Sequence, residues 1–523
     1  MKALPRGSVL FAILVLISMM AMVATGVMFR MRAQVYAASV SASSSQARLA
    51  AMSGLQQAMA VLCDNGDDAA WWDNPDAFRD QLVADDGGVR WCFTVYAPRF
   101  ESGQTSVRYG LIDESAKINV NTATAEALAR LPGMNAAMAD AIIDYRDGDD
   151  QAAPQGAERD YYSRLPSPYS PRNGPLATLE ELLLVRGFNA AVVFGEDGNH
   201  NGLLDAGEND GDKSFPPDNG DGHLDAGLSA VLTASTYERD SSDPNRPKFN
   251  INGDLKGLAR TQLPPQAQQY IRTYREDGNF FENIYELLDA SYPPRGGSPI
   301  VSGVSIQQME RLEKTMTVGA ISREIVPADD DTADDPNAPG DDPNNPATGR
   351  GSRRVPPARR PPPAGRRGER PPAAQPPSQD ANDPNDSPQE ESQGPPVPGR
   401  LNINTAPVEV LCLLPGVDTN LAERIVQARS TLDDGQMTSR TWIYSQKLVD
   451  AQTFKKLAPM ITTSSRQYRV RCVGYGISAQ GGRGAGYCVL EAVVDVSGRA
   501  PRIVYLRDLT RLGMPLAVAS SST

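Results

Sequence analysis

The chain has 523 residues, enough for an anchor and roughly two to four domains. It carries 51 Lys and Arg against 64 Asp and Glu, so its net charge of −13 disfavours broad binding to nucleic acid or anionic membranes. The two histidines and five cysteines form no Ser/His/Asp group and no CxxC pair, and the sequence has no phosphate-binding loop. We therefore expect no enzymatic activity.

The first element is an apolar run of 21 uncharged residues, 9–29, which ends at Arg30. As a helix at about 1.5 Å per residue it would be roughly 31 Å long, enough to cross a hydrocarbon core of about 30 Å. A secretory signal peptide has a shorter apolar core with its cleavage site behind it. Here the cleavage-like Gly7 stands in front of the run. The alternatives are an uncleaved single-span anchor and a leader, residues 1–7, that is cut before Ser8.

The first seven residues resemble the leader of a type IV prepilin, which implies that prepilin peptidase cuts between Gly7 and Ser8. The fifth residue of the mature chain would then be Ala12, where major pilins and most pseudopilins have a Glu. A carboxylate in hydrocarbon is costly unless it has a partner, so Ala12 is typical of a subunit that needs no such partner. The pseudopilin class that typically lacks this Glu is minor pseudopilin K of the type II secretion system.

The sequence behind the apolar run predicts a long helix. No Pro occurs between Arg30 and Leu62, and Leu55, Met59 and Leu62 share one helical face. We expect one helix over residues 8–62, half in the membrane and half packed on a globular head.

Two separate stretches of the chain would form that head. Residues 63–116 would form its first part and residues 462–523 its last part. Their alternating patterns predict strands that would join in one antiparallel sheet against the helix, at 89–96, 107–112, 468–475, 486–495 and 502–507. Cys472 and Cys488 flank a Gly-rich loop between two of these strands, which predicts a hairpin-closing disulfide in an oxidising compartment.

An internal repeat lies between the two parts of the head. Residues 117–147 align without gaps with residues 400–430, and both contain N-x-N-T-A followed by L-P-G. In each copy a Thr, Thr122 or Thr405, would cap a first helix, and the L-P-G would turn the chain into a second helix. Those second helices are expected to end at Arg146 and Arg429. Each copy is therefore predicted to be a helix–hairpin–helix, the first inside an inserted helical domain over 117–326 and the second over 400–461.

These hairpins also resemble the DNA-binding modules of competence proteins, whose hairpin N–H groups hold phosphate. Such hairpins usually read G-x-G, whereas this chain has Asn135 and Asp418 in place of the second Gly. Asp418 would place a negative charge beside a phosphate. We therefore favour a structural or protein-contact role and expect no nucleic-acid partner. The alternative is a membrane-anchored helix–hairpin–helix protein that binds DNA for uptake.

Residues 197–208 match a twelve-residue calcium loop, with Gly202 at the turn. The predicted ligands are Asp197, Asn199, Asn201, the carbonyl of Leu203, Asp205 and Glu208. Oxygen ligands suit Ca²⁺; the alternatives are an acidic loop without metal, and zinc bound through His200 and His223. A partial second copy would use Asp218, Asn219, Asp221 and Asp225.

Residues 327–399 are dominated by Pro, Asp, Asn, Arg and Gly, which predicts a disordered tether. The alternative is that the basic middle part of this segment contacts acidic lipid or nucleic acid.

The leader, Ala12, the hairpin repeat and the calcium loop together resemble minor pseudopilin K of the type II secretion system. The resemblance implies an α+β fold: a pilin-like N-terminal helix with an antiparallel sheet, plus a large inserted, mainly helical domain of helix–hairpin–helix (SAM-like) units. It implies a single-pass inner-membrane protein whose C-terminal head lies in the periplasm. Its place would be the tip of the pseudopilus, where it helps to start assembly and the export of folded proteins across the outer membrane. The implied partners are minor pseudopilins I, J and H, prepilin peptidase and the inner membrane.

Overall fold

The computed structural model describes residues 6–64, 69–101, 104–211, 213, 215–238, 248–294, 297–318, 397–433, 435–478, 483–498 and 500–514. The expected tether lies outside these residues except for 397–399. The first five residues of the expected leader also lie outside them. Gly7 and Ser8 belong to the first helix, and cleavage between them stays a prediction.

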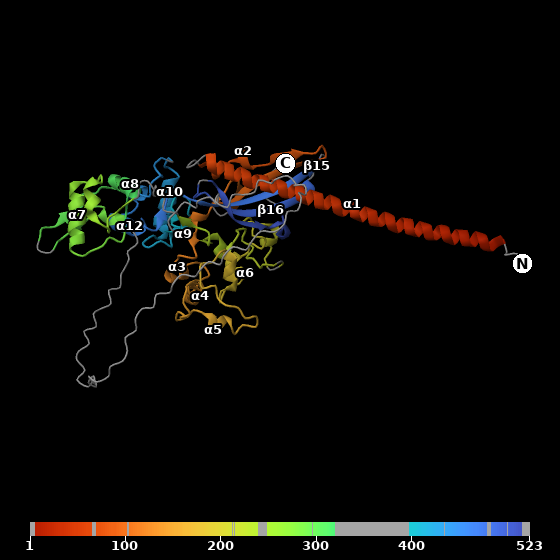
Figure 1. Ribbon diagram of the computed structural model, residues 1–523, viewed down its shortest axis with the longest axis horizontal. Coiled ribbons are helices and arrows are strands. Elements are labelled where there is room, and N and C mark those ends of the chain that lie inside the picture. The colour runs from red at the N-terminus through yellow and green to blue at the C-terminus, as the bar shows by residue number, and fades with distance from the viewer. Residues whose placement is uncertain are drawn as a thin grey trace, which may run out of the picture. The chain divides into compact units, whose positions relative to one another are not determined.

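Helix α1 (Arg6–Asp64) is uninterrupted, which confirms the helix expected over residues 8–62. The side chains of residues 10–40 are exposed, and the stretch Leu10–Cys63 is long and apolar enough to cross a membrane. The C-terminal part of α1 instead lies along the sheet (Figure 1). There it buries a face of mostly small side chains, formed by Ala47, Ala50, Ala51, Leu55, Ala58 and Val61.

The sheet combines strands from both ends of the chain, as the sequence predicts. These strands are β1 (Gln81–Asp85), β2 (Val89–Glu101), β3 (Gln104–Arg108), β4 (Ile112–Asp113), β15 (Gln467–Ser478), β16 (Arg483–Asp495) and β17 (Arg502–Asp508). Their order is β1-β2-β15-β16-β17, with β3 on β2 and β4 on β15. β2 and β15 are antiparallel neighbours, and Cys92 lies opposite Tyr475. Two details differ: β1 was not predicted, and the strand expected at 107–112 is divided between β3 and β4.

Two glycines allow α1 to approach the sheet closely. A Cβ on Gly474 of β15 would lie 2.1 Å from the carbonyl oxygen of Ala47 and 2.4 Å from the nitrogen of Ala51. A Cβ on Gly54 of α1 would lie 2.3 Å from Sγ of Cys472. The strand backbone at Gly474 therefore meets the helix backbone directly, and the side chain of Cys472 fills the space above Gly54.

The predicted disulfide between Cys472 and Cys488 is wrong, because both thiols are free in the structure. The register of β15 and β16 places Cys472 opposite Leu490 and Cys488 opposite Gly474. The two cysteines are thus diagonal neighbours, whose Cβ atoms are typically about 7–8 Å apart, whereas a disulfide needs about 4 Å. Register cannot be read from the loop between two strands.

The insertion contains three related units, although the sequence comparison found two. Each unit is closed by a pair of short parallel strands: β5 (Ile118–Asn119) with β6 (Leu232–Thr233), β8 (Phe249–Asn250) with β11 (Met316–Thr317), and β13 (Leu401–Asn402) with β14 (Ile461–Thr462). Two residues after each first strand, the Nδ2 group of an Asn donates to two backbone carbonyls. These residues are Asn121, Asn252 and Asn404. The Phe249–Asn252 stretch therefore opens the unit that the sequence comparison missed.

Short helices fill the units. The first has α3 (Ala125–Ala129), α4 (Ala136–Arg146), α5 (Arg159–Tyr162) and α6 (Ala190–Phe194); the second has α7 (Pro265–Glu276) and α8 (Ile306–Thr315); the third has α9 (Val408–Leu411), α10 (Thr419–Arg429), α11 (Trp442–Ser445) and α12 (Ala451–Leu457). One continuous apolar core runs through all three units. Helix α2 (Pro75–Phe78) belongs to the sheet part, and two further strand pairs are β7 (Tyr237–Glu238) with β12 (Val397–Pro398) and β9 (Ser291–Tyr292) with β10 (Ile300–Val301). β12 shows that the last residues of the expected tether are paired.

The two predicted hairpins are confirmed, since α4 and α10 end at Arg146 and Arg429. The predicted caps are wrong. Thr124 caps α3 by accepting from the N–H of Ala127, while Pro407 occupies the cap position of α9. The hydroxyl of Thr405 instead donates to Asp113.

Candidate metal site

The backbone of the loop 197–208 folds around the side chain of its first residue, Asp197. Asp197 lies just after α6 and accepts hydrogen bonds from the N–H groups of Asn201 and Gly202, each at 2.9 Å. Gly202 has a φ of +70°, the left-handed conformation that the turn requires. Asp197 is 3 % exposed, so its carboxylate is held inside the loop.

The remaining predicted side-chain ligands meet in the same loop. The Nδ2 groups of Asn199 and Asn201 each donate to Oδ2 of Asp205 at 2.7 Å. Glu208 returns to the start of the loop, where it accepts from the N–H of Gly198 at 3.0 Å, and it also accepts from the N–H of Asp205 at 3.1 Å. The structure therefore brings the polar side chains of the predicted site together, and hydrogen bonds among them link all the predicted positions.

The acidic groups of this loop carry charge that is poorly compensated. Burial raises the pKa of Asp197, and Arg471 opposes that rise. Burial also raises the pKa of Glu208 to about 7, with the charges of Asp197 and Asp205 adding to it. A cation among these oxygen atoms would offset both effects, so the donor set fits Ca²⁺.

The histidines do not join the oxygen atoms as zinc ligands in this arrangement. The ring of His200 stacks on Phe194 with centroids 3.9 Å apart, and burial lowers the pKa of His200 to about 4. His223 is exposed. The two histidine side chains therefore have different surroundings, and the oxygen atoms of the loop are the better candidates for metal ligands.

The second predicted loop is organised around a residue that the sequence analysis missed. Glu196 accepts from the N–H of Asn219 at 3.1 Å and from the N–H of Asp225 at 3.2 Å. Asp218 accepts from three backbone N–H groups, those of Asp210, Gly211 and Gly220. Asn219 and Asp221 each accept from the N–H two residues ahead. The four predicted side chains thus shape the loop, and Glu196 next to Asp197 joins it to the first one.

The first loop is docked on the sheet face opposite α1. Nη1 of Arg471 donates to the carbonyl of Asn201 at 2.8 Å, and its Nε donates to Glu491 at 2.9 Å. Leu203 is 2 % exposed and packs among apolar side chains of that face, including Tyr96 and Tyr475. Both a polar and an apolar contact therefore fix the loop to the strands.

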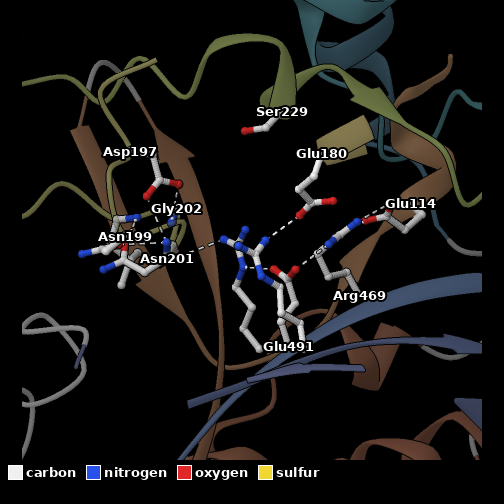
Figure 2. A network of polar contacts seen from close by, with 12 residues as sticks. Glu114, Glu180, Asp197, Asn199, Asn201, Gly202, Ser229, Arg469 and Glu491 are labelled. Atoms are coloured by element: carbon white, nitrogen blue, oxygen red, sulfur yellow. Dashed lines mark hydrogen bonds and ion pairs between the residues drawn. The ribbon is translucent and has the colours of Figure 1, made fainter. Parts of the chain in front are cut away.

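Arg471 belongs to a buried ionic network, which we call the Arg–Glu network: Arg469, Arg471, Glu114 and Glu491. Arg469 donates to Glu114 at 2.6 Å and to Glu491 at 2.7 Å, and Figure 2 shows it between the two carboxylates. Burial is the largest single influence on each Glu and would raise its pKa, but nearby cations and hydrogen bonds together lower both pKa values to about 2. The cations are Arg469 and Lys117 for Glu114, and Arg469 and Arg471 for Glu491. The network connects the sheet with Glu114 at the start of the insertion.

A pattern in β15 could have indicated this network. Arg469 and Arg471 alternate with Tyr468, Val470 and Cys472, so the strand has one charged and one apolar face. The acidic partners could not be found in this way, because Glu114 lies 355 residues before Arg469.

In each hairpin a side chain caps the second helix. Asn135 accepts from the N–H of Met138, and Asp418 accepts from the N–H of Leu421. Gly133 and Gly416 have φ values of +72° and +80° and turn the chain just before these caps. The residues that replace the second Gly of a DNA-binding hairpin therefore serve as helix caps, which favours a structural role.

Comparison with known proteins gives a family for part of the chain. Residues 111–194 match the family model described as Type II secretion system (T2SS), protein K, and residues 399–462 match the helix-hairpin-helix motif model. Among solved structures, the GspK-GspI-GspJ complex from the type 2 secretion system of enterotoxigenic Escherichia coli is similar at a TM-score of 0.36 and 10 % identity, covering 92 % of this chain and 99 % of the other. A TM-score this low does not establish a common fold. No curated protein matches the sequence. The family match confirms the resemblance to protein K.

Proposed function

We propose that this relative of type II secretion system protein K is the minor pseudopilin at the tip of a pseudopilus, where it helps to start fibre assembly and the export of folded proteins across the outer membrane. The observation that carries the proposal is the two-part character of α1. Its uncharged stretch over 9–29 is exposed from Leu10 onward, whereas its C-terminal part is packed on the sheet. Pilin-like subunits need one helix of this kind, because it serves first as an anchor and then as the spine of the fibre.

The anchor would lie in the inner membrane, with the sheet and the insertion in the periplasm. Prepilin peptidase would cut between Gly7 and Ser8, so that the apolar stretch remains in the mature protein. Ala12 would then stand where other subunits carry a Glu. A subunit with nothing stacked above it has no use for that carboxylate, and this supports the tip position.

The loop 197–208 would hold Ca²⁺ through the six groups named above. A bound ion would supply positive charge beside Asp197 and Glu208, which are buried with little compensation. The chain positions the loop by itself, since Arg471 holds the carbonyl of Asn201 and Leu203 packs on the sheet. Calcium would therefore stiffen the contact between the insertion and the sheet. The loop around Glu196 is the second candidate, through Asp218, Asn219, Asp221 and Asp225.

The proposed partners are the minor pseudopilins of types I, J and H. The solved complex named above contains GspK together with GspI and GspJ. The contact residues on this chain are a matter for experiment. We do not propose DNA uptake, because the hairpin N–H groups of Met138 and Leu421 are already paired with caps.

Co-expression of the full chain with prepilin peptidase and the three minor pseudopilins tests the proposal. We expect a protein that begins at Ser8 and co-purifies with the other subunits from detergent. Replacement of Gly7 by a bulky residue should abolish the size change and serves as the matched control. A native protein that begins at Met1, or one that never associates with the companion subunits, would contradict the proposal. Tight, salt-sensitive binding of duplex DNA would favour the uptake function instead.

The calcium part is tested by thermal unfolding of the full chain with calcium and with a chelator. We expect a higher unfolding midpoint with calcium and a smaller difference in Glu208→Gln. Asp160→Asn is the control, because that carboxylate is 93 % exposed in a surface ion pair. An unchanged midpoint in the wild type would remove the calcium proposal and leave the pseudopilin role untouched.

A further inference from the structure

A second group of acidic side chains lies in the first unit, where α4 ends and α5 begins. Asp144, Asp147 and Glu158 each place a carboxylate oxygen within 4.8 Å of the other two. Within the described part of the chain, this is the one group of three or more His, Cys, Asp and Glu side chains with that geometry. None of these residues belongs to the loop 197–208 or to the second loop, and no motif in the sequence indicated them.

Two of the three residues are buried, and three of the carboxylate oxygen atoms have no hydrogen-bond partner. Glu158 is 5 % exposed and Asp144 is 1 % exposed. Neither carboxylate oxygen of Glu158 has a hydrogen-bond partner, and Oδ1 of Asp147 has none either. Glu158 occupies the cap position of α5, yet its side chain makes no capping hydrogen bond. Its carboxylate is instead close to those of Asp144 and Asp147, an arrangement that costs free energy unless something compensates the charge.

The backbone holds Asp144 in place. Both of its oxygen atoms accept from the N–H of Ala153, at 3.0 and 3.2 Å. Gly156 leaves room for the carboxylate, since a Cβ there would lie 1.9 Å from Oδ2 of Asp144. The chain between α4 and α5 thus folds around this carboxylate, as a loop does around an ion ligand.

The nearby basic side chains are engaged elsewhere. Arg146 donates to the carbonyls of Val120 and Ala123, and Arg186 donates to the carbonyl of Gly156. Arg159 faces Asp150 at the surface, with Nε and Oδ1 4.0 Å apart. These three arginines therefore place their hydrogen bonds and their ion pair outside the group, although the charge of Arg146 still acts on Asp147.

We propose that Asp144, Asp147 and Glu158 bind a divalent cation of the calcium type, at a site separate from the loop 197–208. Ca²⁺ lies about 2.3–2.6 Å from its oxygen ligands, so oxygen atoms on opposite sides of one ion are up to roughly 4.6–5.2 Å apart. The oxygen atoms of this group lie within 4.8 Å of one another, so they are close enough to share one such ion. Zinc prefers nitrogen and sulfur ligands, and none is present in the group. The ion would tie the segment between α4 and α5 to the second helix of the hairpin.

Counting bound calcium on the full-length protein in detergent tests this site. Equilibrium dialysis against Ca²⁺ followed by elemental analysis gives the number of ions per chain. We expect Glu158→Gln to lose one ion per chain relative to the wild type. Asp160→Asn, in the same short helix but 93 % exposed, should lose none. An unchanged count in a folded Glu158→Gln protein would overturn the proposal.

Variants in the other loop keep the two calcium proposals distinguishable. If both sites bind, Glu208→Gln/Glu158→Gln should lose one ion more than Glu208→Gln alone. Asp147→Asn, at a half-buried position, is the second variant in case Glu158→Gln does not fold, and we expect the same loss of one ion. If Glu208→Gln alone removes every bound ion and all stabilisation by calcium, the site at Glu158 does not exist. If Glu208→Gln changes nothing while Glu158→Gln loses an ion, the proposal stands without the loop 197–208.

Discussion

The two faces of the sheet bind their partners by different physical means. The face toward α1 is apolar, and it meets the helix backbone directly at Gly474 and Gly54. The opposite face carries the Arg–Glu network, which binds the start of the insertion and the loop 197–208. The residues alternate along the same strand, since Val470 and Cys472 face the helix while Arg469 and Arg471 face the insertion.

This difference indicates what each contact contributes. Close apolar packing is insensitive to pH and depends on shape, so it suits a helix that must remain on the sheet as the spine of the subunit. A buried ionic network gains little over apolar residues but is strongly destabilising when one partner is removed. It therefore specifies which segment docks on the sheet. The faces should accordingly respond to different perturbations.

The largest effect is expected from Arg469→Ala on the charged face. The substitution removes the cation that is hydrogen-bonded to Glu114, which keeps only the charge of Lys117, and leaves Glu491 with only Arg471. It should lower the free energy of unfolding by about 3–5 kcal/mol. Urea unfolding of the full chain in detergent measures it. In Arg469→Met/Glu114→Gln no unpaired carboxylate remains at position 114, so this variant should be less destabilised. Equal stabilities for the two variants would mean that lost packing, and not unpaired charge, dominates this face.

The second-largest effect is expected from acidification, which should weaken the contacts made by the charged face. The folded-state pKa values of Glu114 and Glu491 are lowered to about 2 from an ordinary value of 4.5, because the surrounding cations and hydrogen bonds together outweigh the effect of burial. A lowered pKa means that the contribution to stability is complete above pH 4.5 and is lost as the pH falls from about 4.5 to about 2. The urea midpoint measured between pH 7 and pH 3 should fall more steeply for the wild type than for Arg469→Met/Glu114→Gln. Parallel pH profiles would show that other carboxylates cause the acid sensitivity.

The stability of the apolar contact should depend on side-chain size and not on pH. In Gly474→Ala the new Cβ would lie 2.1 Å from the carbonyl of Ala47, so helix and strand must separate, at a cost of about 1–3 kcal/mol. The loss should be the same at pH 7 and pH 4. Gly498→Ala is the control, since the nearest atom to its Cβ, the carbonyl oxygen of Ala500, is 3.7 Å away. A tolerated Ala at position 474 would mean that α1 can shift on the sheet without loss.

The sequence was sufficient to predict the elements whose residue pattern is periodic, alternates or is repeated. The length of α1, the strands on both sides of the insertion and the hairpins ending at Arg146 and Arg429 all followed from periodicity and from the repeat. The second unit was missed because its hairpin reads L-P-P instead of L-P-G and is shorter than the other two. Only its strand pair, β8 with β11, and the hydrogen bonds of Asn252 reveal it.

Contacts between distant segments could not be predicted from the sequence. The register of β15 and β16 decides whether Cys472 can reach Cys488, and no feature of the intervening loop encodes it. The partners of Asp113 are Asn402 and Thr405, nearly 300 residues away, so a Thr expected to cap a helix joins the third unit to the sheet instead. The loop 197–208 could be predicted because its proposed ligands lie within twelve residues of the sequence. Asp144, Asp147 and Glu158 meet only through the fold, since the segment 148–157 separates Glu158 from the other two.

The smallest effect is expected where a charged pair lies beside the apolar face. Nη1 of Arg48 on α1 and Oδ2 of Asp508 on β17 are 2.6 Å apart, but both side chains are more than 40 % exposed. An ion pair in water contributes about 0–1 kcal/mol and is screened by salt, so Arg48→Ala should lower the free energy of unfolding by less than about 1 kcal/mol. Urea unfolding in low and in high salt measures it, and the difference from wild type should shrink with added salt. A loss as large as that of Arg469→Ala would mean that α1 is held by this charge and not by its packed small side chains, and the contrast between the two faces would fail.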